Sequence, residues 1–287
     1  NPPIFLFFLR FFFLILSIDI QVGSLTIICF FLIATVGVSH GSLDHVKGTK
    51  LFKILKIKNK LFFYLIYIFI SLLIVCIWLL FPFFTLTIFL IIASHHFGKE
   101  DSVFGKIKRF KLHDLFLFSK GSLVILAPLC FHTYETIQIF EILDIKFNQL
   151  NINLIVILMF LSLISNFFVN KNIFLSLLDS LTIIILNINF EPLLAFTIYF
   201  CFLHSIRHSL SLIKEMNNKN LKKSSIIFLK KAMPLTVVTA LGFLIAVFLL
   251  NEYYLLNSAI IKVIFIGLAS LTFPHILLEY LLGKNEK

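Results

Sequence analysis

Two histidines four residues apart, His204 and His208, lie inside a long apolar stretch with Arg207 between them. On an α-helix, residues four apart differ by about 40° around the axis, so both imidazoles point to one face. Two imidazoles on one face can bind a single metal ion. Because ionisable side chains inside a membrane span are costly, they indicate a functional site. The stretch therefore predicts a metal site, to which other histidines of the chain would have to be brought.

Three further apolar runs carry histidine, at His40, at His95–His96 and at His275 after Pro274. The depth of each histidine is counted from the outer end of its expected span at a rise of about 1.5 Å per residue. The histidines then lie roughly 18–24 Å deep at His40, His96, His204, His208 and His275. Four different spans would thus carry histidine to one layer in the cytoplasmic half of a bilayer. Two further histidines, His113 and His132, fall near span ends and are expected at the interfaces.

Each of these histidines has a simpler alternative role. A lone histidine in a membrane often forms a hydrogen bond between helices, and His275 stays open between metal ligand, outer partner and packing group. His95 and His96 differ by about 100° around a helix, so only one of them is expected to face the site.

Acidic residues follow two of the histidine positions. Asp44 lies four residues after His40 and shares its face, whereas His45 is turned away by about 140°. Asp44 and Asp101 are candidate acceptors for the second ring N–H of a metal-bound imidazole. Glu100 is open between the same role and that of a solvated loop residue.

The composition places the chain in a membrane. The 287 residues are 60% hydrophobic with a mean hydropathy of +1.03, far above the range of soluble domains. The apolar runs are continuous rather than alternating, which favours helices over a β-barrel. The formal net charge of +11 does not indicate a nucleic-acid partner, because the basic residues fall in short connections. We predict an all-α polytopic membrane protein with a single membrane-embedded domain over residues 1–287.

A membrane span needs about 20 apolar residues, and the sequence contains about ten such runs. Lysine and arginine concentrate after the second, fourth and eighth runs, and the positive-inside rule assigns these connections and both termini to the cytoplasm. The four isolated cysteines are expected to be packing residues, and the first run lacks the cleavage motif of a signal peptide. The expected spans are Ile4–Ile20, Ser24–Ser39, Leu61–Phe81, Phe83–His96, Leu112–Phe131, Ile152–Val169, Ile173–Leu186, Pro192–Ile213, Pro234–Leu250 and Ala259–Leu282.

In order and spacing, the histidine motifs resemble those of the bacteriorhodopsin-related-protein-like (Brp/Blh) family, the integral-membrane β-carotene 15,15′-dioxygenases of bacteria and archaea. The resemblance runs from the second expected span to the tenth. Ser42 and His95 depart from residues that are common in the family. The motifs that carry the resemblance are His40-Gly-Ser-Leu-Asp44-His45, His96-Phe-Gly-Lys-Glu-Asp101, His204-Ser-Ile-Arg-His208 and Pro274-His275.

The resemblance implies a non-haem Fe(II) cofactor and the cleavage of the central 15,15′ double bond of β-carotene with O₂ to give two molecules of retinal. It also implies a bacterial inner-membrane location, entry of the substrate from the lipid bilayer, and a functional link to a rhodopsin that uses retinal. The implied catalytic iron ligands are His40, His96, His204 and His208, and the candidates for positions around them are Asp44, His45, Asp101 and His275.

Other histidine-rich membrane proteins stay open on the sequence. A desaturase or hydroxylase would carry several HxxxH and HxxHH boxes, but here one HxxxH pair is present and Ile92 stands where an HxxHH box would begin. A metal transporter would place polar residues along a path through the whole membrane, and a bis-histidine haem carrier would show a Soret band. The histidines expected in one layer favour an enzyme.

Overall fold

The computed structural model describes residues 22–102, 112–147, 150–169, 173–216 and 220–285, without the side chains of 22–24, 40 and 215. Every regular element in these ranges is a helix, in agreement with the all-α prediction. The elements are α2 (Val22–Leu32), η1 (Ile33–Gly37), η2 (Val38–Leu43), α3 (Asp44–Ile54), α4 (Leu61–Leu80), α5 (Pro82–Glu100), α6 (His113–Phe131), α7 (Thr133–Ile142), α8 (Ile152–Val169), α9 (Ile173–Asn189), α10 (Pro192–Ile198), η3 (Tyr199–Ser205), α11 (Ile206–Met216), α12 (Leu221–Leu250) and α13 (Leu256–Asn285).

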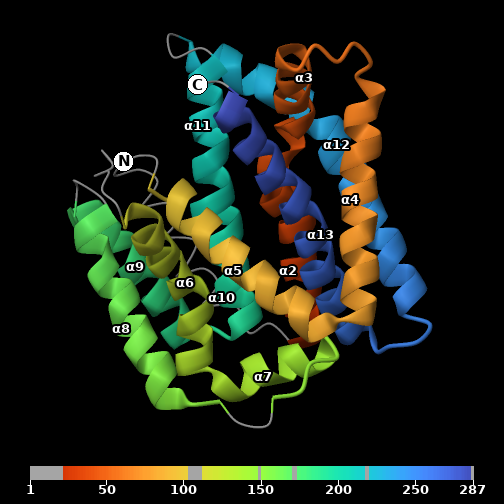
Figure 1. Cartoon of the computed structure of the whole chain (residues 1–287). Helices are drawn as coiled ribbons and strands as arrows, with labels where there is room; N and C mark the ends of the chain where they lie inside the picture. The colour runs from red at the N-terminus through yellow and green to blue at the C-terminus, as the bar shows by residue number, and fades with distance from the viewer. Residues whose placement is uncertain (1–21, 103–111, 148–149, 170–172, 217–219, 286–287) are drawn as a thin grey trace.

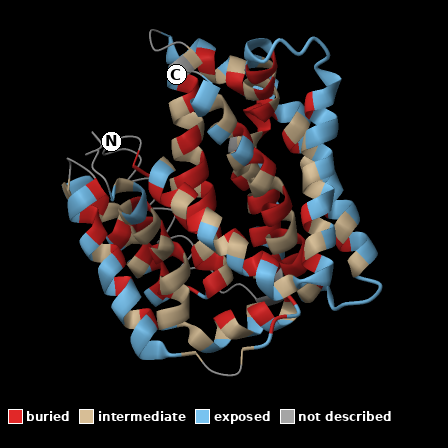
Figure 2. Cartoon of the chain, in the orientation of Figure 1, coloured by how far each residue is buried: buried red, intermediate tan, exposed pale blue. Residues whose placement is uncertain are grey.

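The helices surround a central pair of columns. One column is α2–η1–η2–α3 and the other is α13, with α4 and α12 on one side and α6, α8 and α9 on the other (Figure 1). Helix α5 runs obliquely between the two sides, and the short α7 lies across one end. Buried residues concentrate in the centre, while the outer helices expose much of their surface (Figure 2).

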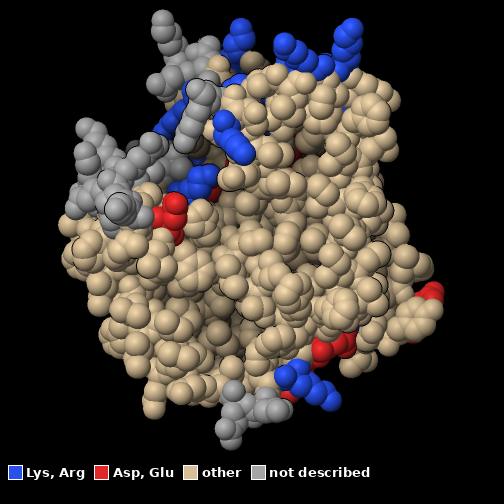
Figure 3. Space-filling view, in the orientation of Figure 1, with Lys and Arg blue, Asp and Glu red and all other residues tan. Residues whose placement is uncertain are grey.

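The exposed surface of the outer helices is apolar. Leu65 of α4, Phe160 of α8 and Val238 of α12 are each more than half exposed. Figure 3 shows most of the visible lysine and arginine at one end of the molecule, further charged side chains of both signs at the other end, and a broad uncharged band between them. Such a band suits lipid, because a protein in water rarely exposes so much contiguous apolar surface.

Seven helical segments are long and apolar enough to cross a bilayer. Of the ten expected spans, Ile4–Ile20 lies outside the described residues. The fourth and seventh correspond to α5 and to the 17-residue α9. Neither of these helices is among the seven that are both long enough and apolar enough to cross a bilayer. The seven segments are Leu25–Ile54, Leu61–Leu80, His113–Phe131, Ile152–Val169, Pro192–Lys214, Leu221–Leu250 and Leu256–Asn285.

The boundaries of two expected spans are wrong. Helix α12 begins at Leu221 instead of Pro234, because Asn220 caps it by accepting a hydrogen bond from the Lys223 backbone N–H at 3.0 Å. Pro234 is accommodated inside the helix, as membrane helices allow. The second span does not end at Ser39 either, since its column continues through α3 to Ile54. Lysines predicted to lie in loops are therefore helical.

Close packing of α5 on α6 fixes the position of the segment that carries His96. A side chain at Gly98 would overlap the carbonyl oxygen of Leu117, and one at Gly121 would overlap that of Ser94. The two backbones thus meet at a point where only hydrogen fits in place of Cβ. This contact holds the end of α5 in place against α6.

We expect Gly98→Ala and Gly121→Ala to destabilise the protein by about 1–3 kcal/mol or more, because overpacking against a backbone cannot be relieved by a rotamer change. The matched control is Gly242→Ala in α12, where an added Cβ meets nothing within 4 Å. The measurement is thermal unfolding in detergent. Equal midpoints for the three variants would contradict the proposed packing.

Candidate metal centre

Four histidines from separate elements meet inside the protein. His96 of α5 lies with its ring centroid 5.3 Å from that of His204 in η3 and 5.3 Å from that of His275 in α13. His208 of α11 lies 6.3 Å from His275. All four residues are buried. The structure thus brings His96, His204 and His208 together and adds His275 as a member of the same cluster.

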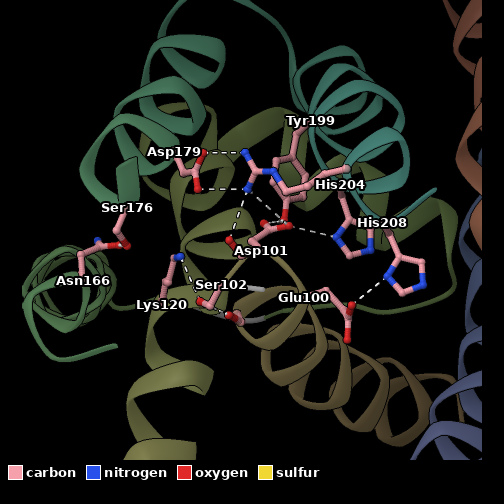
Figure 4. A network of polar contacts seen from close by, with 12 residues as sticks. Glu100, Asp101, Ser102, Lys120, Asn166, Ser176, Asp179, Tyr199, His204 and His208 are labelled. Carbon is pink, nitrogen blue, oxygen red and sulfur yellow. Dashed lines mark hydrogen bonds and ion pairs between the residues drawn. The ribbon is translucent and has the colours of Figure 1, made fainter. Parts of the chain in front are cut away.

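Three of these imidazoles are held by a carboxylate at Nδ1. Asp101 lies 3.2 Å from Nδ1 of His204, and Glu100 lies 2.7 Å from Nδ1 of His208 (Figure 4). Both oxygens of Asp44 lie 2.9 Å from Nδ1 of His275. A carboxylate at Nδ1 favours the tautomer in which Nδ1 carries the proton and Nε2 the lone pair that can bind a metal.

A π-helical turn aligns two residues with one carboxylate. In η3, the Tyr199 hydroxyl donates a hydrogen bond to Asp101 at 2.6 Å, and His204 contacts the other oxygen of the same carboxylate. Residues five apart differ by about 140° in an α-helix. In a π-helix, backbone hydrogen bonds link residues i and i+5, so these two residues lie one above the other along the axis. The π turn therefore places Tyr199 and His204 on the same face.

A half-buried ion pair continues the network outward from Asp101. Arg207 donates two hydrogen bonds to Asp179 of α9, at 3.0 and 2.6 Å, and a weaker one to the Asp101 carbonyl oxygen at 3.4 Å. Tyr67 of α4 holds Asp44 in a similar way, with its hydroxyl 2.9 Å from the carboxylate. The contacts of Tyr199 and Tyr67 and the Arg207–Asp179 pair were not predicted from the sequence, because the partners are distant in the chain.

The remaining sequence candidates take other positions. His95 faces Asp114 at 3.9 Å with 43% of its side chain exposed, so His96 is the member of that pair that joins the cluster. His45 contacts the nearby Ser42 carbonyl at 2.9 Å instead of a cluster residue. The His40 side chain lies outside the described part of the structure. Its helix η2 passes the cluster, since a Cβ built at Gly41 would lie 3.9 Å from Nδ1 of His275.

One acidic residue near the cluster was not predicted. Glu279 follows His275 by one helical turn, and its Oε1 lies 3.8 Å from Nε2 of His275. The same oxygen is paired with Lys47 of α3 at 2.7 Å. Ligand atoms of His96, His275 and Glu279 lie within 4.8 Å of one another. The signal available in the sequence was the four-residue spacing from His275.

Acidic side chains outnumber basic ones around the histidines. Among the described residues, the buried and half-buried charged side chains of this region comprise five carboxylates and three cations, and the exposed Lys99 lies 3.9 Å from Glu100. A negative excess lowers the cost of burying a cation. The carboxylates are Asp44, Glu100, Asp101, Asp179 and Glu279, and the cations are Lys47, Lys120 and Arg207.

Imidazoles that share one ion at a metal–nitrogen distance of about 2.1 Å have ring centroids roughly 4.5–6.5 Å apart, and the three separations given above fall in this range. Among the described residues, the group whose ligand atoms lie within 4.8 Å of one another is His96, His275 and Glu279, without His204 and His208. Imidazole nitrogen supplemented by carboxylate oxygen suits iron, zinc or copper rather than magnesium or calcium.

An apolar cavity of about 450 Å³ reaches the histidines. His96, His204 and His275 line it, together with phenylalanines and aliphatic side chains from α4, α5, α6, α7, α10, α12 and α13. Two of its lining residues, Ile68 of α4 and Val238 of α12, are more than half exposed. The cavity wall therefore includes side chains of α4 and α12 that are also exposed on the apolar outer surface.

A sequence profile of the β-carotene 15,15′-dioxygenase family matches residues 31–283, which covers every element of the cluster. The chain belongs to the β-carotene 15,15′-dioxygenase family. It is therefore a dioxygenase, and the resemblance seen in the histidine motifs is confirmed.

A curated relative agrees with this membership. Over 265 residues the chain is 27% identical to a protein named beta-carotene 15,15′-dioxygenase from the uncultured marine bacterium 66A03. The alignment covers 86% of this chain and 90% of that protein. No solved structure matches the chain.

We expect Asp101→Asn to weaken metal binding by about 10–100-fold, the usual effect of losing the group that orients a histidine ligand. The matched control is Asp114→Asn, since Asp114 is 88% exposed and contacts only the outward-facing His95 among the histidines. Metal content per chain after dialysis against a chelator is the measurement. Equal retention by both variants would show that Asp101 does not act on the site.

Proposed function

We propose that this dioxygenase cleaves the central 15,15′ double bond of β-carotene with O₂. The double bond breaks, and each oxygen atom of O₂ becomes the aldehyde oxygen of one retinal, so no external reductant is required. The observation that carries the proposal is a buried histidine cluster in contact with an apolar cavity. Membership of the β-carotene 15,15′-dioxygenase family supports the choice of substrate and bond.

The proposed cofactor is Fe(II), bound by His40, His96, His204 and His208, with His275 as a fifth candidate. When bound, iron supplies the redox chemistry that O₂ requires and a template that orients the reactants. The support for this assignment is the spacing of the described rings and the charge of the acidic residues around them. Asp101, Glu100 and Asp44 would hold three imidazoles with Nε2 toward the metal.

The cavity walls have the task of positioning the polyene. Phe97 and Phe200 pack against His204, with ring centroids 4.8 and 5.8 Å from the imidazole. Their rings would keep water away from the reacting bond and restrict the polyene to poses near the metal.

The lipid bilayer is the proposed source of the substrate. β-Carotene is insoluble in water and partitions into hydrocarbon. The cavity wall includes side chains of α4 and α12 that are exposed on the apolar outer surface, where we propose that the substrate enters. We propose a bacterial inner-membrane enzyme of about ten spans with the lysine-rich end and both termini in the cytoplasm. Retinal released into the same membrane would reach a rhodopsin that uses it.

We expect His204→Ala to abolish retinal formation and His95→Ala to leave it intact, because only His204 lies in the buried cluster. The measurement is chromatography of pigments from a β-carotene-accumulating host that expresses each variant. Normal cleavage by His204→Ala would refute the site, and longer apocarotenals from the unmodified protein would refute the central position of cleavage.

We expect Val238→Trp to slow cleavage at least severalfold, because a large side chain at the proposed opening would obstruct entry of the polyene. The matched control is Val237→Trp. Val237 is the neighbour of Val238 and is also exposed, but it does not line the cavity. Initial rates of retinal formation in membranes test this, with metal content expected to be equal in both variants. Equal rates would place the entry elsewhere.

A further inference from the structure

Glu279 lies at the metal centre without a role in the four-histidine assignment. It extends from α13 one turn beyond His275, on the same face of the helix, and its side chain is only 12% exposed. The two residues are 3.8 Å apart at Oε1 and Nε2. A carboxylate this close to a histidine Nε2 faces the region in which a metal held by that nitrogen would lie.

We propose that Glu279 is a carboxylate ligand of the metal centre, which it forms with His96 and His275. This inference rests on the proposed function only in its claim that the histidines bind a metal. One ligand atom from each of the three residues lies within 4.8 Å of the others. Atoms bound to one ion at about 2.1 Å are up to about 4.2 Å apart. Three atoms arranged evenly around one ion are about 3.0–3.6 Å apart, so a pair at the 4.8 Å limit would have to approach by about 1–2 Å on metal binding.

The chemistry of the set points to iron among the divalent metals. With Glu279, the centre would combine histidines of the proposed site with one carboxylate, and mixed histidine–carboxylate ligand sets are used by non-haem Fe(II) oxygenases. A purely imidazole site leaves both charges of the ion to be balanced by more distant acids. A bound carboxylate neutralises one of them directly, which matters most in a low-dielectric interior.

The position of Glu279 leaves the reaction side of the centre accessible. His96 and His275 line the apolar cavity, whereas Glu279 and its ion-pair partner Lys47 of α3 do not. Coordination by Glu279 would therefore not block the cavity side, where the polyene and O₂ must meet. Lys47, with a side chain 18% exposed, pairs with the same carboxylate at 2.7 Å.

The simpler alternative is that Glu279 has a purely structural role, as the ion-pair partner of Lys47. The two roles separate in a double-mutant comparison of Glu279→Gln, Lys47→Met and the double variant. If only the ion pair matters, each single variant leaves a buried charge without its counter-charge, and removing both relieves the defect. If Glu279 binds the metal, the double variant stays as defective as Glu279→Gln, and Lys47→Met retains the metal.

The probes are Fe²⁺ and Co²⁺ added to the full-length protein in detergent, with Glu141→Gln, at an exposed residue of α7, as the charge-matched control. We expect Glu279→Gln and the double variant to release metal to a chelator at least about tenfold faster than wild type. Their Co²⁺ absorption spectrum should also change, whereas Glu279→Asp should restore part of the retention. Wild-type retention in Glu279→Gln, or its recovery in the double variant, would overturn the proposal.

These measurements do not depend on carotenoid cleavage. A wild-type protein that retains metal through Glu279 but forms no retinal would overturn the proposed reaction and support this ligand. Retinal formation with unchanged metal retention in Glu279→Gln would do the reverse.

Discussion

The structure depends on the neutralisation of charge in an apolar interior. Histidines, the acids that orient them and the proposed metal ion can be buried together only if their charges balance and each polar group has a partner. The segment at the end of α5 meets much of this requirement, because His96 joins the cluster while Glu100 and Asp101 hold His208 and His204. Asp101 is itself held by Tyr199 and by the Arg207–Asp179 pair. Removing any one of these charges leaves its partner buried without compensation.

Helix packing follows from the same requirement. The end of α5 must reach both η3 and α11, so its backbone passes α6 at Gly98 and Gly121 with no space for a side chain. The column beside it adapts in a different way. The π turns η1 and η3 contact each other through the Ser205 hydroxyl, which donates to the Val36 carbonyl oxygen at 2.7 Å. Such turns insert one residue into a helix and rotate the next helical turns around the axis, and they are frequent at functional sites.

Much of this arrangement was predictable from the sequence. Apolar runs predicted the helices, the His204/His208 spacing predicted a shared face, and the acids after His96 were recognised as candidate partners. Local spacing could not assign Asp44, which was expected on the face of His40 but contacts His275 from α13. It also could not predict the π turn that brings Tyr199 to Asp101, since α-helical geometry separates residues 199 and 204. Proline at 234 was over-interpreted as a helix start. The cavity-lining helix α7 was not predicted, since it lies in the connection between the expected spans Leu112–Phe131 and Ile152–Val169.

Cleavage at the centre of a symmetric polyene requires room on both sides of the metal. The lining residues of the cavity come from α4 and α12 and also from α6, α7 and α10, helices that lie on opposite sides of the central columns (Figure 1). A cavity that approached the histidines from a single direction and stopped there would favour cleavage near one end of the chain. The position of cleavage in the proposed reaction then depends on the distance between the histidines and each end of the cavity. The helices that form the cavity walls determine how far the cavity extends. The proposed metal ligands determine only where along the polyene the reaction takes place.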